Sequence, residues 1–583
     1  MAPVGSRESL VAAIQAGADS VYFGIGQLNM RSHSANQFTI DDLRDIAATC
    51  KEHGMKSYLT VNTVIYGEDL GTMHTIIDAA KEAQVTAVIA SDVAVMMYCR
   101  QVGVEVHLST QLNISNIDAL KFYAQFADVA VLARELNMEQ VADIHQQIAQ
   151  QRILGPNGEL VRIEMFCHGA LCMAVSGKCY LSLHDANRSA NRGQCVQLCR
   201  RSYTVTDKET GTQLDIDNEY IMSPKDLKTV RFIDQMMNAG VRVFKIEGRA
   251  RGPEYVYTVV RCYKEAIASV LEGTFTEEKK DEWDERLSSV FNRGFWDGYY
   301  QGQTLGEWTK HYGNKATEKK VLVGKVIKHF SKLGVAEIAV EASELQLGDH
   351  VLITGTTTGV MYFDAKEIRY ELNPVEKANK GTRVSIPVPD KVRPNDKVFK
   401  LVKNDIDKEK TAKYAVVLTS YKALKPNKTT SFARQNYHHN MSTSSINALQ
   451  EEVIEEFSAF DDWMDKYQML IDLGNELPPL DAKYKVESNL IEGCQSRVWL
   501  QCDLQDGLLV FTADSDALIT KGIIALLIRV LSNHTPAEIV ASNLHFIDAI
   551  GLKDHLSPTR SNGLLSMVKQ IKAYALGYAA KQQ

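Results

Sequence analysis

The first 270 residues alternate short β-rich runs with longer amphipathic stretches, and this alternation constrains the fold more than any other feature. Strands separated by helices form crossover units, which place the strands parallel in a sheet that is buried on both faces. Seven such runs are visible, at 20–24, 56–62, 87–92, 105–111, 128–136, 162–169 and 241–248. The opening residues MAPVG fit the tail of an eighth. We therefore expect an α/β fold with a (β/α)8 TIM-like barrel over residues 1–315, and an open doubly wound sheet is the alternative.

The 583-residue chain is too long for one domain, and its composition changes three times after the predicted barrel. Residues 316–404 contain short strands broken by Gly, Pro and Asp turns, which is typical of a small antiparallel β-barrel. Residues 405–447 are polar, basic and without periodicity, which indicates a flexible linker. Residues 448–583 begin and end with helical patterns around a strand hairpin, which predicts a compact α+β domain.

No apolar run approaches the length of a membrane-spanning helix, and the N-terminus lacks the basic and apolar segments of a secretory signal. We therefore expect a cytoplasmic protein with no membrane partner, in which structural disulfides are rare. The net charge of −7 argues against a uniformly basic nucleic-acid-binding surface but allows a local basic patch.

Five of the ten cysteines fall within residues 167–199, which calls for a specific reason. Four of them have the spacing Cys172-x6-Cys179-x15-Cys195-x3-Cys199. The paired C-x2-C arms of a zinc knuckle and the C-x3-C-x2-C triad of radical enzymes are both missing. Four thiolates at irregular spacing suit a four-iron–four-sulfur (4Fe-4S) cluster, and zinc or a metal-free site remain as alternatives.

Basic residues surround these thiols, and residues 188–206 contain no acid. The basic residues are Lys178, Arg188, Arg192, Arg200 and Arg201. Cations lower the pKa of neighbouring thiols and partly offset the charge of an anionic cluster. We expect Arg192 and Arg200 in particular to bind a cofactor, and the same arginines could also hold a phosphate or an anionic substrate.

Polar side chains also follow the predicted strands, where active sites of (β/α)8 barrels collect. They are Asn62, Asp92, Gln111, Arg134, Glu135, His168, Lys245, Glu247 and Arg249. Any one of them can be an ordinary cap or turn residue, so the prediction concerns the set, which indicates a polar rim. The sequence contains neither H-E-x-x-H nor G-x-S-x-G, so standard metalloprotease and serine-hydrolase sites lack support.

Four short stretches of sequence, here called blocks, follow one another in this part of the chain. They are HGALCMAVSGKC (168–179), NRGQCVQLCRRSY (191–203), YIMSPKDL (220–227) and FKIEGRARGPEYVYTVV (244–260). They resemble the signature blocks of the collagenase-like peptidase family, whose catalytic type is unclassified. The resemblance covers residues 1 to about 402. Because members of that family usually have several residues before the Ala-Pro turn that complete the first strand, we expect such residues here as well.

Better understood members of that family hydroxylate RNA, at a tRNA wobble uridine or at a cytidine of large-subunit ribosomal RNA. The resemblance therefore implies an iron–sulfur cluster on Cys172, Cys179, Cys195 and Cys199, with prephenate as the source of the hydroxyl group. It also implies that four residues of the matching blocks face the cavity. They are His168, Lys245, Glu247 and Arg249.

Three blocks of the last domain carry a second resemblance. They are WMDKYQMLIDLGNELPPL (463–480), IEGCQSRVWL (491–500) and SPTRSNGL (557–564). They resemble SufE, the sulfur-acceptor protein of iron–sulfur assembly. The resemblance implies that Cys494 takes a persulfide from a cysteine desulfurase and passes it to an iron–sulfur scaffold. Arg560 would stabilise the thiolate or persulfide, and Asp514 would hold the cysteine loop.

Together these features predict an iron–sulfur RNA-modifying enzyme, with tRNA uridine as the preferred target, fused to a persulfide acceptor. A flexible tether would raise the local concentration of the sulfur carrier beside the cluster of the same chain. The alternatives are ribosomal cytidine hydroxylation, a non-catalytic sulfur-relay factor, and a peptidase as the family label states.

Overall fold

The computed structural model divides into two units, Met1–Thr411 and Ala412–Gln583. It describes the chain apart from residues 31, 33–37, 201–203, 207–212, 216–222, 305, 310–313, 405–444, 459, 461–462, 493–495, 557 and 583. Most of the predicted linker therefore lies outside the described residues. Within the described ranges, no helix is both long and apolar enough to cross a membrane.

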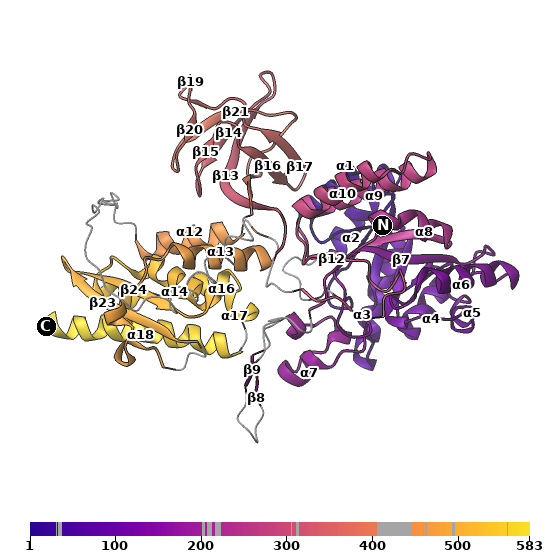
Figure 1. Ribbon diagram of the computed structural model, residues 1–583, viewed down its shortest axis with the longest axis horizontal. Helices are drawn as coiled ribbons and strands as arrows, with labels where there is room; N and C mark the ends of the chain where they lie inside the picture. Colours follow the sequence, from indigo (N-terminus) through magenta and orange to yellow (C-terminus); the bar gives the residue numbers. More distant parts are fainter. Residues whose placement is uncertain are drawn as a thin grey trace, which may run out of the picture. The chain divides into compact units, whose positions relative to one another are not determined.

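Parallel strands form the centre of the first unit (Figure 1). They are β1 (Ala2–Pro3), β2 (Ser20–Phe23), β3 (Lys56–Val61), β4 (Ala87–Ala90), β5 (Val106–Leu108), β6 (Val129–Val131), β7 (Arg162–Gly169) and β11 (Val241–Ile246). Each strand from β1 to β7 pairs in parallel with the next, and β11 pairs in parallel with β7. These strands are almost entirely buried, as expected of a parallel sheet covered by helices. All seven predicted runs, and the expected eighth, are thus confirmed as strands.

Closure of this sheet into a barrel is not confirmed, because no ladder of paired strands joins β1 to β11 among the described residues. Two single hydrogen bonds do link them. The amino group of Met1 donates to the carbonyl of Phe244 (2.7 Å), and Ile246 N–H donates to the carbonyl of Met1 (3.1 Å).

A strand that the sequence did not predict extends the sheet beyond β7. Strand β10 (Asp226–Lys228) runs antiparallel to the end of β7, with Leu227 opposite Gly169, and β12 (Phe295–Trp296) pairs in parallel with β10. The chain leaves the sheet after Gly169 and returns to the same place at Asp226. The intervening segment, which carries the clustered cysteines, is therefore held at both ends by the carboxyl end of β7.

Amphipathic helices connect the strands, and several begin at a side chain that caps the first turn. They are α1 (Arg7–Gln15), α2 (Ile40–Glu52), α3 (Leu70–Glu82), α4 (Val93–Val102), α5 (Ile117–Tyr123), α6 (Met138–Gln150), α8 (Ile233–Asn238), α9 (Pro253–Leu271) and α10 (Glu277–Ser289). Asp92, predicted as a rim residue, caps α4 by accepting the Ala94 N–H (2.9 Å). It also accepts the Ile65 N–H (3.0 Å), so its role in this structure is to join two loops.

An eight-stranded antiparallel sheet follows, in the order β17-β16-β22-β13-β14-β21-β18-β19. Its strands are β13 (Glu318–Phe330), β14 (Val335–Val340), β16 (His350–Gly355), β17 (Gly359–Asp364), β18 (Arg369–Tyr370), β19 (Asn373–Pro374), β21 (Arg383–Pro387) and β22 (Lys397–Lys403). The predicted antiparallel strands are confirmed, but a closed barrel is not found. Gln15 of α1 accepts the Val360 N–H (2.9 Å) and donates to the Thr358 carbonyl (2.9 Å), which fixes this sheet to the first helix.

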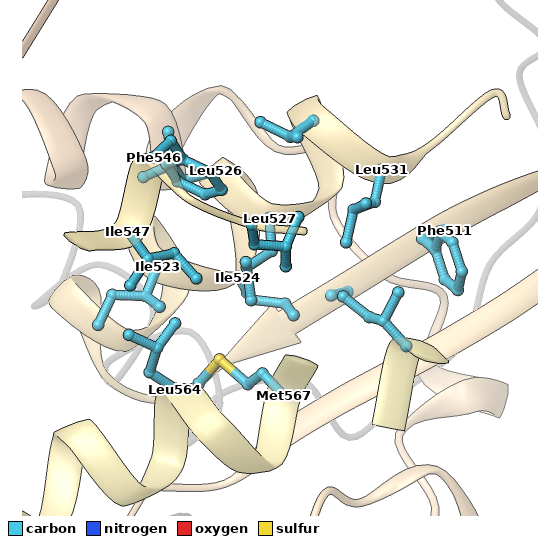
Figure 2. Packing of buried hydrophobic residues seen from close by; sticks show 14 of the residues in the cluster. Phe511, Ile523, Ile524, Leu526, Leu527, Leu531, Phe546, Ile547, Leu564 and Met567 are labelled. Atoms are coloured by element: carbon cyan, nitrogen blue, oxygen red, sulfur yellow. The ribbon is translucent and has the colours of Figure 1, made fainter. Parts of the chain in front are cut away.

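The second unit is an α+β domain built on one hairpin, as predicted. Strands β23 (Val498–Gln505) and β24 (Leu508–Ser515) pair along their whole length. The helices are α12 (Ile446–Ser458), α13 (Trp463–Glu476), α14 (Leu518–Leu531), α15 (Pro536–Ala541), α16 (Phe546–Ala549), α17 (Leu552–His555) and α18 (Pro558–Gln582). Figure 2 shows the core, in which Ile523, Ile524 and Leu527 of α14 lie among Phe511, Phe546 and Met567. The apolar run 522–531 is therefore a buried central helix.

Helices α13 and α14 approach closely because glycines stand at their crossing. A Cβ atom on Gly522 would lie 2.1 Å from the carbonyl oxygen of Leu470, and one on Gly474 would lie 2.8 Å from the backbone nitrogen of Gly522. Only the missing side chains allow the two backbones this separation.

Substituting Gly522→Ala should force these helices apart and destabilise the second unit by about 1–3 kcal/mol, the usual cost of overpacking. The control is Gly577→Ala in α18, where an added Cβ meets nothing within 4 Å and should be neutral or slightly stabilising. Hydrogen–deuterium exchange of α13 and α14 peptides in the full chain measures the effect. Equal protection in the two variants would contradict the close packing.

Candidate functional site

The cysteine-bearing segment covers loops that follow three parallel strands. After β2, Ser32 Oγ donates to the carbonyl of Gly193 (3.3 Å). After β3, Val64 N–H donates to the carbonyl of Asn191 (3.1 Å). After β5, the Asn113 side chain donates to the carbonyl of Ser176 (3.2 Å). The segment therefore lies on the carboxyl edge of the sheet, where the strand-end residues were expected to gather.

Arg192 fastens this segment to the loop after β3. Its guanidinium forms an ion pair with Asp69 and donates to the carbonyl of Val64 (3.3 Å). The same group lies over the ring of Tyr66, 4.1 Å from the ring centroid. Hydrogen bonding to Arg192 lowers the pKa of Asp69, although partial burial of the carboxyl acts in the opposite direction. Arg192 was predicted to bind a cofactor, and here its partners belong to the protein.

Arg200 joins the two ends of the cysteine segment. Its guanidinium donates to Ser223 Oγ (2.6 Å), to the carbonyl of Pro224 (3.0 Å) and to the carbonyl of Leu171 (2.8 Å). It thus joins the beginning of the segment to the point where the chain returns to the sheet. Burial lowers the pKa of Arg200, and the nearby Asp226 opposes that shift. This second predicted cofactor residue also serves the fold of the segment.

The four predicted ligand thiols share one neighbourhood. Cys172 and Cys195 are exposed, whereas Cys179 and Cys199 are partly buried. Burial raises the pKa of Cys199 to about 11; Arg200 opposes this shift, and the other three thiols add to it. The sulfur of Cys195 accepts hydrogen bonds from Gln197 N–H (3.4 Å) and Ser182 Oγ (3.8 Å).

These thiols do not form a site for one ion. Among the described residues, no three His, Cys, Asp or Glu side chains lie close enough together to hold a single metal ion. A multi-iron cluster takes one cysteine thiolate per iron, which is the donor type that these four residues offer. The cluster on these cysteines stays a prediction, with zinc as its alternative.

Arg249 occupies a buried position at the same edge of the sheet, with only 8% of the residue exposed. Its guanidinium donates to Thr60 Oγ1 at the end of β3 (2.8 Å) and to Asn29 Oδ1 in the loop after β2 (3.3 Å). Thr60 donates in turn to the carbonyl of Phe23 (2.9 Å). Arg249 therefore ties the loop after β11 to the ends of β2 and β3.

Asn62 continues this polar network towards β5. Its side-chain oxygen accepts the Met30 N–H (3.3 Å), and its amide nitrogen donates to Ser109 Oγ (3.2 Å) and to Gln111 Oε1 (3.4 Å). Ser109 donates to Gln111. Two of the predicted rim residues, Asn62 and Gln111, are thus brought together.

Lys245 lies in a buried group of charges inside the sheet. Its ammonium is 2.9 Å from Glu164 Oε1, and the other Glu164 oxygen is 3.7 Å from His107 Nδ1. Burial would raise the pKa of Glu164, but Lys245 and His107 outweigh it and hold that pKa at about 2. Burial would lower the pKa of His107, but Glu105 and Glu164 outweigh it and raise that pKa. The negative charge of Glu164 is therefore offset by neighbouring positive charge inside the sheet.

His168 does not join this group. It is 1% exposed and lies among aromatic rings of α9 and β12, namely Tyr255, Tyr263 and Phe295. Burial lowers the pKa of His168 to about 3, so its ring is neutral at ordinary pH. The prediction that it faces the cavity has no support in these contacts, which are those of a core residue.

Two further strand-end residues, Glu247 and Arg134, also contact groups of the protein. Glu247 Oε2 is 3.4 Å from Tyr22 Oη, and its backbone carbonyl accepts Tyr255 Oη (2.8 Å). The guanidinium of Arg134 lies over the ring of Phe166, 3.8 Å from its centroid, and donates to the carbonyl of Ala170 (3.1 Å). Both residues therefore contact groups of the protein at the carboxyl edge.

Sequence reasoning missed three residues that organise the site. Glu164 and His107 stand inside strands rather than at their ends, and Asp69 is the last residue of a short 3-10 helix (Gly67–Asp69) with no motif. Charged residues within otherwise apolar, fully buried strands were the available signal, because such groups are rarely buried without a partner.

In the second unit the structure describes two of the three predicted residues. Asp514 on β24 pairs with Lys521 (2.9 Å) and with Lys485 (2.5 Å). Burial would raise the pKa of Asp514, but these lysines outweigh it and lower the pKa. Arg560 lies on α18 and is partly buried. Cys494 lies outside the described residues, so its relation to both remains a prediction.

Substituting Lys245→Met should leave Glu164 buried without its closest cation and destabilise the first unit by about 3–5 kcal/mol. Since the pKa of Glu164 is about 2 against an ordinary 4.5, its contribution in the wild type is complete above pH 4.5 and is lost as the pH falls towards 2. Hydrogen exchange of β7 and β11 peptides measures the loss. The control, Lys264→Met, breaks an exposed pair with Asp19 and should cost less than about 1 kcal/mol; equal losses would contradict this account.

Each of the two units matches the model of a known protein family. The model of peptidase family U32 matches residues 5–310, and the SufE model, described as an Fe-S metabolism associated domain, matches residues 451–575. A protein of Porphyromonas gingivalis named collagenase is 67% identical over 405 residues, which are 70% of this chain and 98% of that protein.

Two more distant relatives carry RNA-related names. The tRNA hydroxylation protein P1 of Bacillus subtilis is 35% identical over 53% of this chain and 74% of its own length. A 23S rRNA 5-hydroxycytidine synthase of Escherichia coli is 33% identical over 46% of this chain and 39% of its own length. On the match to more than half of its length and on the first relative, the chain belongs to peptidase family U32 and carries a C-terminal SufE domain.

Proposed function

We propose that the chain hydroxylates RNA, with a tRNA uridine as the target, and that it depends on an iron–sulfur cluster. The names of the Bacillus subtilis and Escherichia coli relatives support an RNA substrate. The observation that carries the proposal is the cysteine segment clamped on the carboxyl edge of a parallel sheet, above the network of Arg249, Asn62 and Gln111. This edge is where α/β proteins place their chemistry.

The cluster would be held by Cys172, Cys179, Cys195 and Cys199. When bound, such a cluster supplies electron-transfer or Lewis-acid chemistry. The protein's contribution is to fix the ligands: Arg192 fastens the middle of the segment to the loop after β3, Arg200 joins the two ends of the segment, and hydrogen bonds from Ser182 and Gln197 reach the sulfur of Cys195. We also propose that the sheet closes as a (β/α)8 barrel, because Met1 already bonds to β11.

Prephenate is the proposed source of the hydroxyl group, on the family resemblance. It is a dicarboxylate, so its site needs cations. Arg249 supplies a buried guanidinium at the carboxyl edge, and partial withdrawal from water strengthens its attraction for a carboxylate.

The SufE domain is proposed to carry sulfur to the cluster. The Cys494 thiolate attacks the outer sulfur of a persulfide on a cysteine desulfurase; the sulfur–sulfur bond breaks and the desulfurase thiolate leaves. Arg560 would stabilise the negative charge on Cys494 or on its persulfide. An iron–sulfur scaffold, or the cysteine segment of the same chain, then receives the sulfur.

A peptidase is the second candidate, because the 67% identical relative is named collagenase. Such an activity would need a nucleophile or a metal-bound water. In the part of the chain that the structure describes, no group of three side chains could hold a single metal ion, which gives a metallopeptidase no site. We therefore rank RNA hydroxylation first.

Deletion of the gene should remove one hydroxylated nucleoside from tRNA, and liquid chromatography–mass spectrometry of tRNA and rRNA digests would detect the loss. Complementation with Cys195→Ser should fail, because a ligand thiolate is lost, whereas Cys99→Ala, which changes a buried thiol in α4, should restore the nucleoside. Loss of a ribosomal hydroxycytidine instead would move the target to rRNA. Unchanged nucleosides in both pools would reject RNA hydroxylation.

Cys494→Ala should abolish persulfide formation when the full chain is incubated with a cysteine desulfurase and cysteine, as read by intact-protein mass spectrometry. It should also slow the return of cluster absorbance after oxidative damage. Cys502→Ala is the matched control, because that thiol is buried in β23 and its pKa is raised to about 12. Equal cluster recovery in Cys494→Ala and wild type would reject delivery within the chain while leaving the persulfide role open.

A further inference from the structure

Tyr66 is an exposed aromatic residue that is nevertheless held in one orientation. The residue is 51% exposed, although the guanidinium of Arg192 covers one face of its ring. The backbone N–H of Tyr66 donates to Asp69 (2.8 Å), and the same carboxylate pairs with Arg192. The ring is therefore fixed from one side by an ion pair and remains accessible to solvent.

Other exposed apolar side chains occur on the same loop as Tyr66 and in the cysteine segment that is bonded to this loop. They are Val64, Met173, Val175, Tyr180 and Leu181, each at least 40% exposed. The loop after β3 and the cysteine segment are directly joined, since Val64 donates to Asn191. Scattered exposed apolar residues need no explanation, but a group around a site with catalytic potential indicates a binding surface.

The cysteine segment carries an excess of positive charge. Residues 170–200 contain four Lys or Arg and one acidic residue, Asp185. Arg192 and Arg200 bind within the protein, whereas Lys178, adjacent to Cys179, is exposed. The cysteine segment is thus basic in a chain with a net charge of −7, whereas the loop of Tyr66 carries the acidic Glu68 and Asp69, of which Asp69 pairs with Arg192.

We propose that Tyr66 is a stacking platform for a base of single-stranded RNA next to the target nucleotide, with Tyr180 as a second platform and Lys178 near the phosphates. This inference rests on the proposed RNA hydroxylation and identifies which surface receives the substrate. Aromatic rings and arginine planes are the groups on which unpaired bases stack, whatever their sequence. A base on the open face of Tyr66 would complete a stack of guanidinium, ring and base.

A protein partner would also cover apolar side chains, but it would not need a fixed ring face. Holding Tyr66 beforehand matters for stacking, because the ring then loses little conformational freedom when the base binds. The guanidinium stacked on Tyr66 and the exposed Lys178 of the basic cysteine segment favour RNA as the occupant.

The test measures binding of a short RNA hairpin with a single-stranded loop to the full-length, anaerobically purified chain, by fluorescence anisotropy. Tyr66→Leu keeps an apolar side chain without a π face and should weaken binding about 5- to 100-fold, the usual effect of losing one stacked base. Tyr66→Trp should keep or improve the affinity. Tyr370→Ala, which removes an exposed tyrosine of β18, should leave it unchanged. A blunt RNA duplex should bind weakly to every variant.

The outcomes separate this inference from the proposed function. Failure of the wild type to bind the hairpin would remove the RNA substrate and the stacking platform together. Wild-type affinity in Tyr66→Leu would overturn the stacking platform alone, and would point to a merely apolar contact such as a protein partner makes. Bound iron and thermal unfolding are measured for each variant, and rescue by Tyr66→Trp shows that the ring itself is required.

Discussion

In a parallel sheet every strand ends at the same edge, so the loops after β2, β3 and β5 are neighbours although they are far apart in the sequence. Polar groups of those loops need partners, and the backbone carbonyls of Gly193, Asn191 and Ser176 in the cysteine segment accept hydrogen bonds from them. The segment thus covers the edge of the sheet as well as carrying the thiols. The segment that carries the predicted ligand thiols is therefore the same segment that bonds to the loops of the sheet.

In the first unit, one group of charged residues lies inside the parallel sheet and another lies at its carboxyl edge. Within the sheet, Glu164 lies between the opposite charges of Lys245 and His107 in a place that solvent does not reach. At the carboxyl edge, Arg192 and Arg200 bind carboxylate and carbonyl groups that belong to different loops. Removing one partner of the buried pair between Glu164 and Lys245 is costly in free energy. This pair holds the neighbouring strands in place, and the contacts of Arg192 and Arg200 at the edge depend on those strands.

The cysteines of the chain differ chiefly in burial. Cys99, Cys167, Cys262 and Cys502 are buried, and burial raises the pKa of each thiol to about 12. Thiols of this kind are inert packing residues at ordinary pH. Cys172 and Cys195, by contrast, are exposed within the segment that covers the sheet edge. Exposure within a polar, cationic segment is what metal binding or sulfur chemistry requires.

The sequence by itself determined the parallel strands, the antiparallel sheet, the hairpin domain and the family, because burial on both faces and turn chemistry leave local patterns. It could also single out the four thiols and the strand-end residues. Only the tertiary structure decided what these residues touch. It placed His168 in an aromatic core, gave Arg192 and Arg200 protein partners, and joined Glu164 to Lys245 across 81 residues of chain. The reason is physical: periodicity records which face of an element is buried, whereas the partner of a buried charge depends on which strands lie side by side.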